Sequence, residues 1–234
     1  MLEFRPEEFE EKIDYHFKDR ELLHSALSHK SYINELKINT YPDYERLEFL
    51  GDAVLELVVS DYLFREKEDL SEGELTKLRA ALVCEPTLAD CAKDFELSSF
   101  ILVGKGEEEQ GSRFKASIVS DVFEAVIGAI YMDGGEEAAR KHIVRFVLKD
   151  MEQKRLFYDA KSILQMRIQK ENRTLSYRVV DETGPDHKKE YEVEVLIDGK
   201  TVSSGKGGSK KAAEQKAAYN ALLSSSDQPG KEGL

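Results

Sequence analysis

The sequence predicts an all-α domain followed by a small α+β domain with the element order α-β-β-β-α. Apolar residues recur every three or four positions from Pro6 to about Lys154, which is the period of helices with one buried face. Beyond about Phe157 the apolar period shortens to two within brief runs, as in half-buried strands. The charge changes at the same place, because residues 1–158 carry about −13 and residues 159–224 about +2.

These changes of pattern also predict the domain boundaries. The expected parts are a helical domain at 1–154, a linker at 155–159, an α-β-β-β-α domain at 160–224 and a disordered tail at 225–234. The difference in charge indicates that the two domains do different work, since an acidic domain can hold cations and a basic one can hold phosphates.

The helices of the first domain are expected at about 7–14, 19–27, 42–65, 71–83, 86–95, 115–132 and 135–152. Ser71 precedes the fourth helix with Glu74 three residues later, which is the pattern of a capping box. Pro86 lies in the first turn of the next helix, where its missing N–H breaks no hydrogen bond. Gly134-Gly135 is expected to end the sixth helix, and the polar segment 104–113 is predicted to be a mobile loop.

The second domain is predicted to begin with a helix at 160–170, followed by strands at 175–181, 190–197 and 200–204. Apolar and polar residues alternate from Tyr191 to Val195, as in a strand with one buried face. Asp198-Gly199 predicts a hairpin with a type I′ turn. An alanine-rich helix at 209–223 completes the domain.

Composition narrows the class of protein. The chain has 234 residues, of which 41% are hydrophobic, enough for real cores. Its first residues are charged and lack the apolar stretch of a secretory signal, and no apolar run approaches the ~18 residues of a membrane helix. We therefore expect a soluble, cytoplasmic protein without a membrane partner. Cys84 and Cys91 lack a CxxC motif and a nearby histidine pair, so we expect core thiols.

The most informative segment is 45–56, with the sequence ERLEFLGDAVLE. Glu45, Glu48 and Asp52 are three and four residues apart, so they share one face of a helix. A second stripe of the same helix is apolar and is expected to face the core: Leu47, Leu50, Val54, Leu57 and Val58. Carboxylates in such an apolar helix are costly unless a group of opposite charge compensates them.

The segment 117–130 repeats the anomaly. It is apolar on nearly every face, which is typical of a buried helix, and yet it carries Asp121 and Glu124 on one side. Gly51 and Gly128 lie inside the two acidic helices, where glycine costs roughly 1 kcal/mol relative to alanine. Such a cost is tolerated where two helices approach each other closely, which indicates that the two carboxylate pairs meet.

Four carboxylates from two apolar helices would form a set of oxygen donors that suits Mg²⁺, with Mn²⁺ as a substitute. A site of this kind can polarise a phosphodiester and activate water. The alternative is that Glu48, Asp52 and the other pair face solvent or form ion pairs with Arg46, Arg79 or Arg113.

The segment 205–213 (GKGGSKKAA) begins the last helix. Ser209 can cap that helix, and its N-terminal end is partly positive, which favours anions. Lys210 and Lys211 in the first turn, with Lys206 just before it, are placed to bind phosphates. The alternative is a solvated alanine-rich helix without a binding role.

These residues carry a resemblance to a known family. The segment 45–56 closely resembles the signature of ribonuclease III, 120–128 (SDVFEAVIG) resembles its second acidic helix, and 72–82 (EGELTKLRAAL) matches the segment between them. Residues 160–223 resemble a double-stranded-RNA-binding domain through the motifs KSILQ, GPDHKKEY and SKKAAEQ. The resemblance covers nearly the whole chain, in the bacterial order of one catalytic domain and then one binding domain.

The resemblance implies a metal-dependent endoribonuclease in which Glu48, Asp52, Asp121 and Glu124 are the catalytic metal ligands. Glu45 is linked in the family to contacts across a homodimer or to RNA. The catalytic domain is expected to dimerise, so that each of two sites cuts one strand of a duplex by direct attack of activated water. The products would have 5′-phosphates, 3′-hydroxyls and short 3′ overhangs, and the family's usual substrates are ribosomal and other precursor RNAs, including messenger RNA.

For the second domain, the resemblance implies an RNA-binding set of seven residues: Lys161, Gln165, His187, Lys206, Ser209, Lys210 and Lys211. The first helix and the loop with His187 would reach adjacent minor grooves, and the two lysines of the last helix would bind phosphates between them. Met166 stands where many relatives have Glu, and Ala212 occupies a position that is often basic. Both departures bear on RNA affinity.

Two other functions fit parts of the sequence. One is a catalytically inactive relative that binds double-stranded RNA as a structural protein, which would be expected to lose members of the acidic quartet. The other is a metal-dependent helical phosphohydrolase of nucleotides, which would have no use for an RNA-binding domain.

Overall fold

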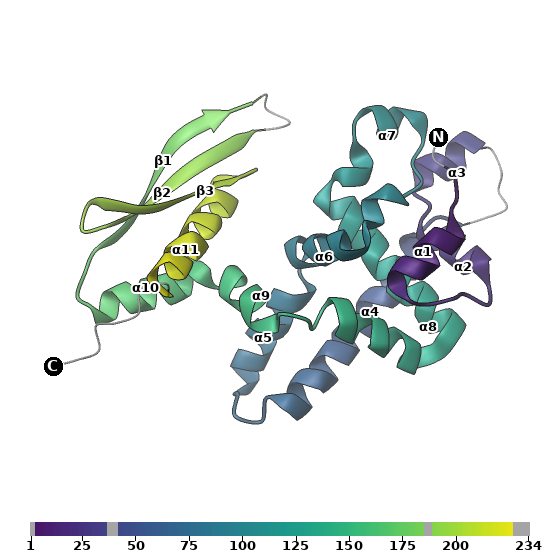
Figure 1. The fold of residues 1–234 in the computed structure, drawn as a ribbon, viewed down its shortest axis with the longest axis horizontal. Coiled ribbons are helices and arrows are strands. Elements are labelled where there is room, and N and C mark those ends of the chain that lie inside the picture. The colour runs from purple at the N-terminus through teal and green to yellow at the C-terminus, as the bar shows by residue number, and fades with distance from the viewer. Residues whose placement is uncertain (1–2, 37–41, 185–188, 227–234) are drawn as a thin grey trace. The chain divides into compact units, whose positions relative to one another are not determined.

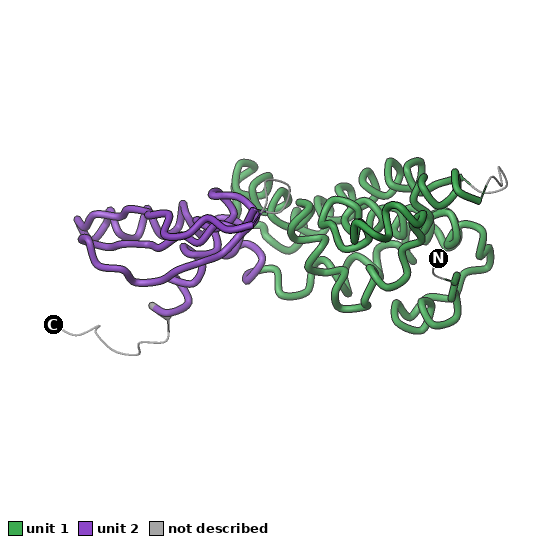
Figure 2. Tube along the Cα trace, turned by 90° about the horizontal axis from the view of Figure 1, so that it is seen from above, with its two compact units in different colours: residues 1–151 green, residues 152–234 purple. Residues whose placement is uncertain are grey.

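The computed structural model describes residues 3–36, 42–184 and 189–226. The chain forms two compact units, Met1–Met151 and Glu152–Leu234, which Figure 2 shows in separate colours. The first unit is helical, and the second combines helices with a three-stranded sheet (Figure 1). The predicted fold class, an all-α domain followed by an α+β domain, is therefore confirmed. Along the described ranges no helix has the length and apolar character to cross a membrane.

Eight α-helices and three short 3-10 helices make up the described part of the first unit. The α-helices are α1 Pro6–Ile13, α2 Arg20–Ala26, α3 Lys30–Leu36, α4 Glu45–Glu66, α5 Glu72–Val83, α6 Glu85–Cys91, α7 Lys105–Glu109 and α8 Ala116–Phe146. The 3-10 helices are η1 Ala92–Phe95, η2 Leu97–Ser99 and η3 Ser112–Phe114. Helices α4 and α8 share the most extensive contact in the unit, and the other helices pack around them.

Local sequence signals explain several helix ends. Ser71 and Glu74 form both hydrogen bonds of a capping box at the start of α5, and Pro86 lies in the first turn of α6. Gly135 interrupts α8 with φ 78° and ψ −175°, a conformation that glycine adopts without strain. These three predictions are confirmed.

Two predictions for this unit are wrong. The segment 104–113 contains α7 and leads into η3. It is anchored by its backbone, because the Gly104 N–H donates to Ser31 Oγ at 2.9 Å and the Lys105 N–H donates to Glu35 at 2.7 Å. The helix expected at 135–152 ends at Phe146, because the chain turns at 147–150 with Asp150 at φ 54°. The short helix α3 was not predicted.

Helices α4 and α8 touch at two glycines. A Cβ atom at Gly51 would lie 1.8 Å from the carbonyl oxygen of Glu124, and one at Gly128 would lie 2.2 Å from that of Leu47. Only a residue without a side chain fits at either position, so the close approach expected from the sequence is confirmed.

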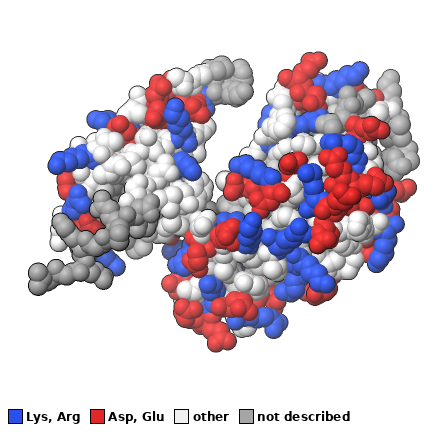
Figure 3. Space-filling model, viewed as in Figure 1, with Lys and Arg blue, Asp and Glu red and all other residues white. Residues whose placement is uncertain are grey.

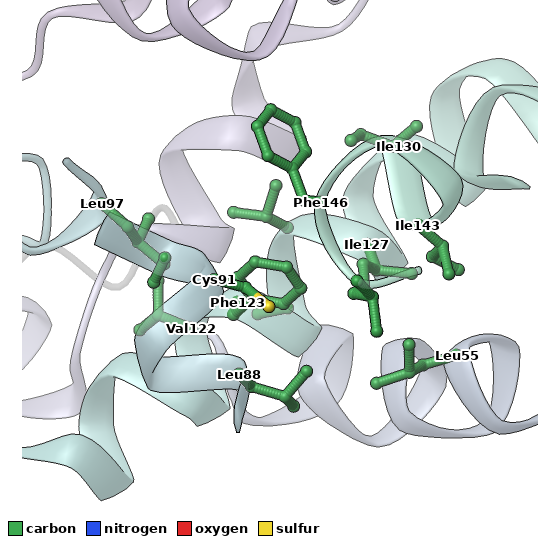
Figure 4. Packing of buried hydrophobic residues seen from close by; sticks show 14 of the residues in the cluster. Leu55, Leu88, Cys91, Leu97, Val122, Phe123, Ile127, Ile130, Ile143 and Phe146 are labelled. Carbon is green, nitrogen blue, oxygen red and sulfur yellow. The ribbon is translucent and has the colours of Figure 1, made fainter. Parts of the chain in front are cut away.

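The core of the first unit surrounds this crossing. Figure 4 shows Leu55 of α4, Leu88 and Cys91 of α6, and Phe123 and Ile127 of α8 within one buried cluster. Cys91 is buried, as expected for a core thiol, whereas Cys84 is half-buried.

The second unit is built from α9 Met151–Tyr158, α10 Ala160–Lys170, β1 Leu175–Thr183, β2 Glu190–Ile197, β3 Lys200–Gly207 and α11 Lys210–Ser226. The strands form an antiparallel sheet in the order β1-β2-β3, and α11 packs on β2, β3 and α10. Asp198 and Gly199 have φ values of 52° and 76°, as the predicted type I′ turn requires. The segment expected as a linker, 155–159, falls in α9 and at Asp159 before α10.

Candidate active site and RNA-binding surface

The acidic quartet lies where α4 and α8 cross. Glu48 and Asp52 come from α4, and Asp121 and Glu124 come from α8. The contact between Gly51 and the backbone of Glu124 fixes the two helices next to these side chains. Glu48, Asp121 and Glu124 are half-buried, whereas Asp52 is exposed. In Figure 3, Asp and Glu side chains gather on the visible face of the first unit.

The electrostatics show that the four carboxylates lie close together. Burial, followed by the charges of Asp52, Glu48 and Asp121, raises the pKa of Glu124 to about 8. Burial also raises the pKa of Glu48, with Asp121 as the largest contributor among the charges. Burial raises the pKa of Asp121 despite hydrogen bonds that oppose the shift. Glu48 and Glu124 therefore resist ionisation because they are partly buried beside other carboxylates, and Asp121 does so because it is partly buried.

Cationic side chains do not neutralise this cluster. Arg79 donates to Ser60 at 3.0 Å and lies 3.9 Å from Glu56, and Arg113 pairs with Glu108. Within the described ranges, none of the four carboxylates forms an ion pair with a protein side chain. The two arginines thus have other partners, and the negative charge of the quartet is left uncompensated.

The quartet is open. Across the residues that the structure describes, no three His, Cys, Asp or Glu side chains already converge as a metal-ligand set. Like charges in one groove repel, so four carboxylates are expected to stay apart without a cation between them. Their chemistry still fits a hard divalent cation, because all four supply oxygen and no lysine or arginine of the described residues forms an ion pair with any of them.

Tyr44 is a site residue that the sequence analysis missed. Its hydroxyl donates to Asp121 Oδ2 at 3.4 Å, and its ring is buried and lies 5.9 Å from the ring of His29. Burial and the Asp121 charge raise the pKa of Tyr44, so the phenol stays protonated and acts as a donor. The available signal was an aromatic residue directly before the acidic helix.

Two residues of the acidic helix lie differently from the sequence expectation. Glu45 is exposed and pairs with Lys30 at 3.2 Å, although its charge still contributes to the raised pKa of Glu48. Leu57 was expected in the core stripe and is 60% exposed, together with Phe49 and Phe64 of the same helix. The periodicity indicated which residues are apolar but not which apolar face is covered.

In the second unit, the expected RNA-binding residues have different surroundings. Lys210 and Lys211 are exposed in the first turn of α11, which Ser209 caps by accepting the Ala212 N–H at 3.1 Å. The remaining members are Gln165, exposed on α10; Lys206, 3.5 Å from Glu192; Lys161, paired with Glu214; and His187, which lies outside the described residues. Met166 and Ala212, the two departures, are both exposed.

A helical unit with an acidic cluster where α4 crosses α8, followed by an α-β-β-β-α unit with a basic helix, is the architecture of a nuclease that acts on double-stranded RNA. A family model described as Ribonuclease-III-like matches residues 19–151, and one described as Double-stranded RNA binding motif matches residues 160–224. The chain belongs to the ribonuclease III family.

Similar proteins agree with this assignment. The chain is 47% identical over 210 residues to Ribonuclease 3 of Shouchella clausii, covering 88% of this chain and 81% of the relative. It is 47% identical over 221 residues to Ribonuclease 3 of Caldanaerobacter subterraneus subsp. tengcongensis, covering 91% and 95%. A solved nuclease domain of ribonuclease III from Campylobacter jejuni matches with a TM-score of 0.57 and 46% identity, over 62% of this chain and 98% of that domain.

The two domains and the relatives establish the activity: the protein is an endoribonuclease of double-stranded RNA. The family is metal-dependent. The inactive, purely structural alternative has no support.

Proposed function

We propose that Glu48, Asp52, Asp121 and Glu124 jointly hold Mg²⁺, with Mn²⁺ as a substitute, and that this site hydrolyses one strand of an RNA duplex while the same site of a second copy hydrolyses the other. The products are 5′-phosphate and 3′-hydroxyl ends with short 3′ overhangs. The observation that carries the proposal is the half-buried, uncompensated acidic cluster where α4 crosses α8.

In this mechanism the protein supplies position and charge. When bound, the cation polarises the phosphodiester and activates water. Glu124 is held by the backbone contact of its own carbonyl with Gly51, and Asp121 is oriented by the Tyr44 hydroxyl. Asp52 is the exposed member of the quartet and is therefore accessible to solvent and to the substrate.

The second unit holds the duplex by its shape. Gln165 on α10 and His187 contact adjacent minor grooves, while Lys210 and Lys211 bind the phosphates across the major groove between them. Exposure of Gln165 and of both lysines supports this assignment. Precursor ribosomal and messenger RNAs in the cytoplasm are the proposed substrates.

A homodimer is proposed to bring two sites to one duplex. Phe49, Leu57 and Phe64 of α4 are 81%, 60% and 75% exposed, and their spacing of eight and seven residues places them along one side of the helix. An exposed apolar stripe of this kind marks a protein interface, and a two-fold dimer buries the same stripe of both copies. Phe49→Ser/Phe64→Ser is expected to sediment as a monomer at concentrations where the unchanged protein is a dimer; an unchanged dimer would refute this interface.

One cleavage experiment tests the proposed function. The substrate is a perfect RNA duplex of about 40 base pairs, more than twice the ~16 base pairs that one RNA-binding domain spans. We expect cleavage with Mg²⁺ and none with chelator, and 3′ overhangs on the products. Intact duplex in the presence of metal would favour an inactive RNA-binding protein, and hydrolysis of free nucleotides would favour a phosphohydrolase.

A further inference from the structure

Lys161 differs from Lys210 and Lys211, the two proposed RNA-binding lysines at the start of α11. Its ammonium group forms an ion pair with Glu214 of α11 and lies 4.9 Å from the centre of the Tyr177 ring on β1. The side chains of Lys161 and Glu214 are 36% and 27% exposed. In contrast, Lys210 and Lys211 are exposed and form no ion pair with any described residue.

The Lys161–Glu214 pair joins the two helices that are proposed to contact RNA. Lys161 lies one turn before Gln165 on α10, and Glu214 lies one turn after Lys210 on α11. Residues four apart share a helix face, so the pair is adjacent to the proposed contact residues of both helices. A link at this point fixes the distance between α10 and the first turn of α11.

A second link reinforces the same junction. The side-chain amide of Gln215, the residue after Glu214, donates to the carbonyl oxygens of Phe157 and Tyr158 just before α10. The Phe157 ring also packs edge-on against Tyr219 of α11, with 5.2 Å between ring centres. The beginning of α10 is therefore held against α11 from two sides.

The ion pair also makes Lys161 less available to bind an RNA phosphate. The positive charge of Lys161 is matched by Glu214, and its ammonium group lies over the face of the Tyr177 ring. The Tyr177 hydroxyl is buried and has no hydrogen-bond partner among the described residues. Moving Lys161 toward a phosphate would leave Glu214 unpaired near this apolar contact.

We propose that Lys161 and Glu214 are positioning residues whose ion pair sets the spacing of α10 and α11 for duplex RNA, and that Lys161 does not bind a phosphate itself. The proposal deepens the proposed RNA-binding role of Gln165, Lys210 and Lys211 and rests on it. A domain that recognises RNA by shape must hold its minor-groove and phosphate contacts at a fixed distance, so a small shift of α10 against α11 weakens several contacts together.

The test measures duplex affinity against salt concentration for the full chain without divalent metal, so that no cleavage occurs. Lys161→Met and Glu214→Gln are each expected to weaken binding by roughly two- to fivefold, the range of a partly exposed ion pair. The slope of log affinity against log salt should stay unchanged, because no phosphate contact is lost. The double variant should bind no worse than either single variant.

A phosphate contact at Lys161 predicts a different pattern and would overturn the proposal. Lys161→Met would then lower the salt slope by about one, as expected for the loss of a phosphate contact. Glu214→Gln would tighten binding, because it removes an acidic group beside the RNA and releases Lys161. Unchanged affinity in both variants would also overturn it.

Three further variants keep the test decisive. Lys210→Met is the reference for a phosphate contact and should lower the slope by about one, whereas Lys200→Met in the β2–β3 hairpin controls for removal of a lysine elsewhere. The exchange Lys161→Glu/Glu214→Lys retains an ion pair and should bind within about twofold of the unchanged protein, even if the single variants fail to fold. Loss of binding in this exchange would contradict the proposal.

The Lys210→Met variant separates this proposal from the proposed phosphate contact. An unchanged salt slope for Lys210→Met would refute the phosphate contact of Lys210 alone, because the sign of the Glu214→Gln effect does not depend on Lys210.

Discussion

The two units of this protein carry unpaired charge in opposite ways. In the first unit, Glu48, Asp121 and Glu124 are half-buried on α4 and α8, and burial raises the pKa of all three, with neighbouring carboxylates adding to the shift at Glu48 and Glu124. In the second unit, Lys210 and Lys211 are exposed on the first turn of α11, where water solvates them. Burying like charges is costly, whereas displaying them in water is not.

This difference indicates what each unit binds. A buried cluster of one sign needs a counter-ion that the protein itself holds, which fits a divalent cation in the catalytic unit. Exposed lysines attract a polyanion from solution and release its counter-ions, which fits RNA. Cutting and binding are therefore expected to respond separately to mutation, and the following predictions test this separation.

The largest effect is expected from Glu124→Gln. This change removes a proposed metal ligand but no phosphate contact, so cleavage should fall by roughly a thousandfold or more while duplex affinity stays within about twofold. Gel cleavage and filter binding on one duplex give both values. Glu137→Gln is the matched control, since Glu137 is exposed on α8, the same helix as Glu124, and lies 4.0 Å from Lys141. Equal loss of cleavage and binding would end the separation of the two units.

Gly51→Ala should destabilise the first unit by roughly 3 kcal/mol or more, because the new Cβ atom meets the Glu124 carbonyl at 1.8 Å and the backbones must move apart. Urea unfolding measures the loss in free energy. Gly73→Ala on α5 is the control, since nothing lies within 4 Å of its Cβ position; this change should stabilise by about 0.5–1 kcal/mol. Similar stability of the two variants would show that α4 and α8 are not in contact at Gly51.

His142 is expected to make a contribution to the unfolding free energy of the first unit that depends on pH. This side chain is buried against Phe123 and Phe146, and neither ring nitrogen has a hydrogen-bond partner among the described residues. Burial and the Arg145 charge lower the pKa of His142 to about 3. The unfolded chain binds a proton at His142 below pH ~6.5 and the folded protein does not, so the contribution of His142 to stability falls by about 1.4 kcal/mol per pH unit between pH ~6.5 and ~3. Glu124 contributes in the opposite direction, because its raised pKa favours the folded state in acid.

His142→Leu is expected to remove this part of the acid sensitivity. Between pH 7 and pH 5, the His142→Leu variant should lose roughly 2 kcal/mol less unfolding free energy than the unchanged protein loses. Parallel urea titrations at pH 7 and pH 5 measure it. If both proteins lose the same free energy between these pH values, His142 is not buried in its neutral form.

The smallest expected effect concerns the exposed lysines. Lys210→Ala/Lys211→Ala should weaken duplex binding and lower the salt slope by about two, because each lysine contributes one phosphate contact. Cleavage at saturating RNA should remain within about twofold, since the acidic site is intact. An unchanged slope would place the phosphate contacts elsewhere on the unit.

The sequence singled out the candidate site more clearly than its surroundings. Glu48, Asp52, Asp121 and Glu124 stood out because carboxylates in apolar helices break the ordinary pattern, and Gly51 and Gly128 predicted the helix crossing that the structure contains. Tyr44 was missed because a hydrogen bond between residues 77 positions apart leaves no periodic signal. Helix α7 was missed because its stability comes from distant partners, Ser31 and Glu35, rather than from its polar sequence.

The RNA-binding set shows the same limit. A lysine in the first turn of α10 and lysines in the first turn of α11 have equal standing in the sequence, and only the fold pairs Lys161 with Glu214. Leu57 of α4 fits the apolar period as well as its buried neighbours do, although it is exposed. Periodicity gives the faces of a helix, and the tertiary structure decides which of them is covered.

The most direct test is a titration of the full chain with Mn²⁺ in the absence of RNA, in which electron paramagnetic resonance measures how much Mn²⁺ is bound. We predict saturable binding to the unchanged protein and to Glu137→Gln, and at least about tenfold weaker binding to Glu124→Gln. Equal Mn²⁺ affinity in all three proteins would contradict the claim that the carboxylates of α4 and α8 share a cation.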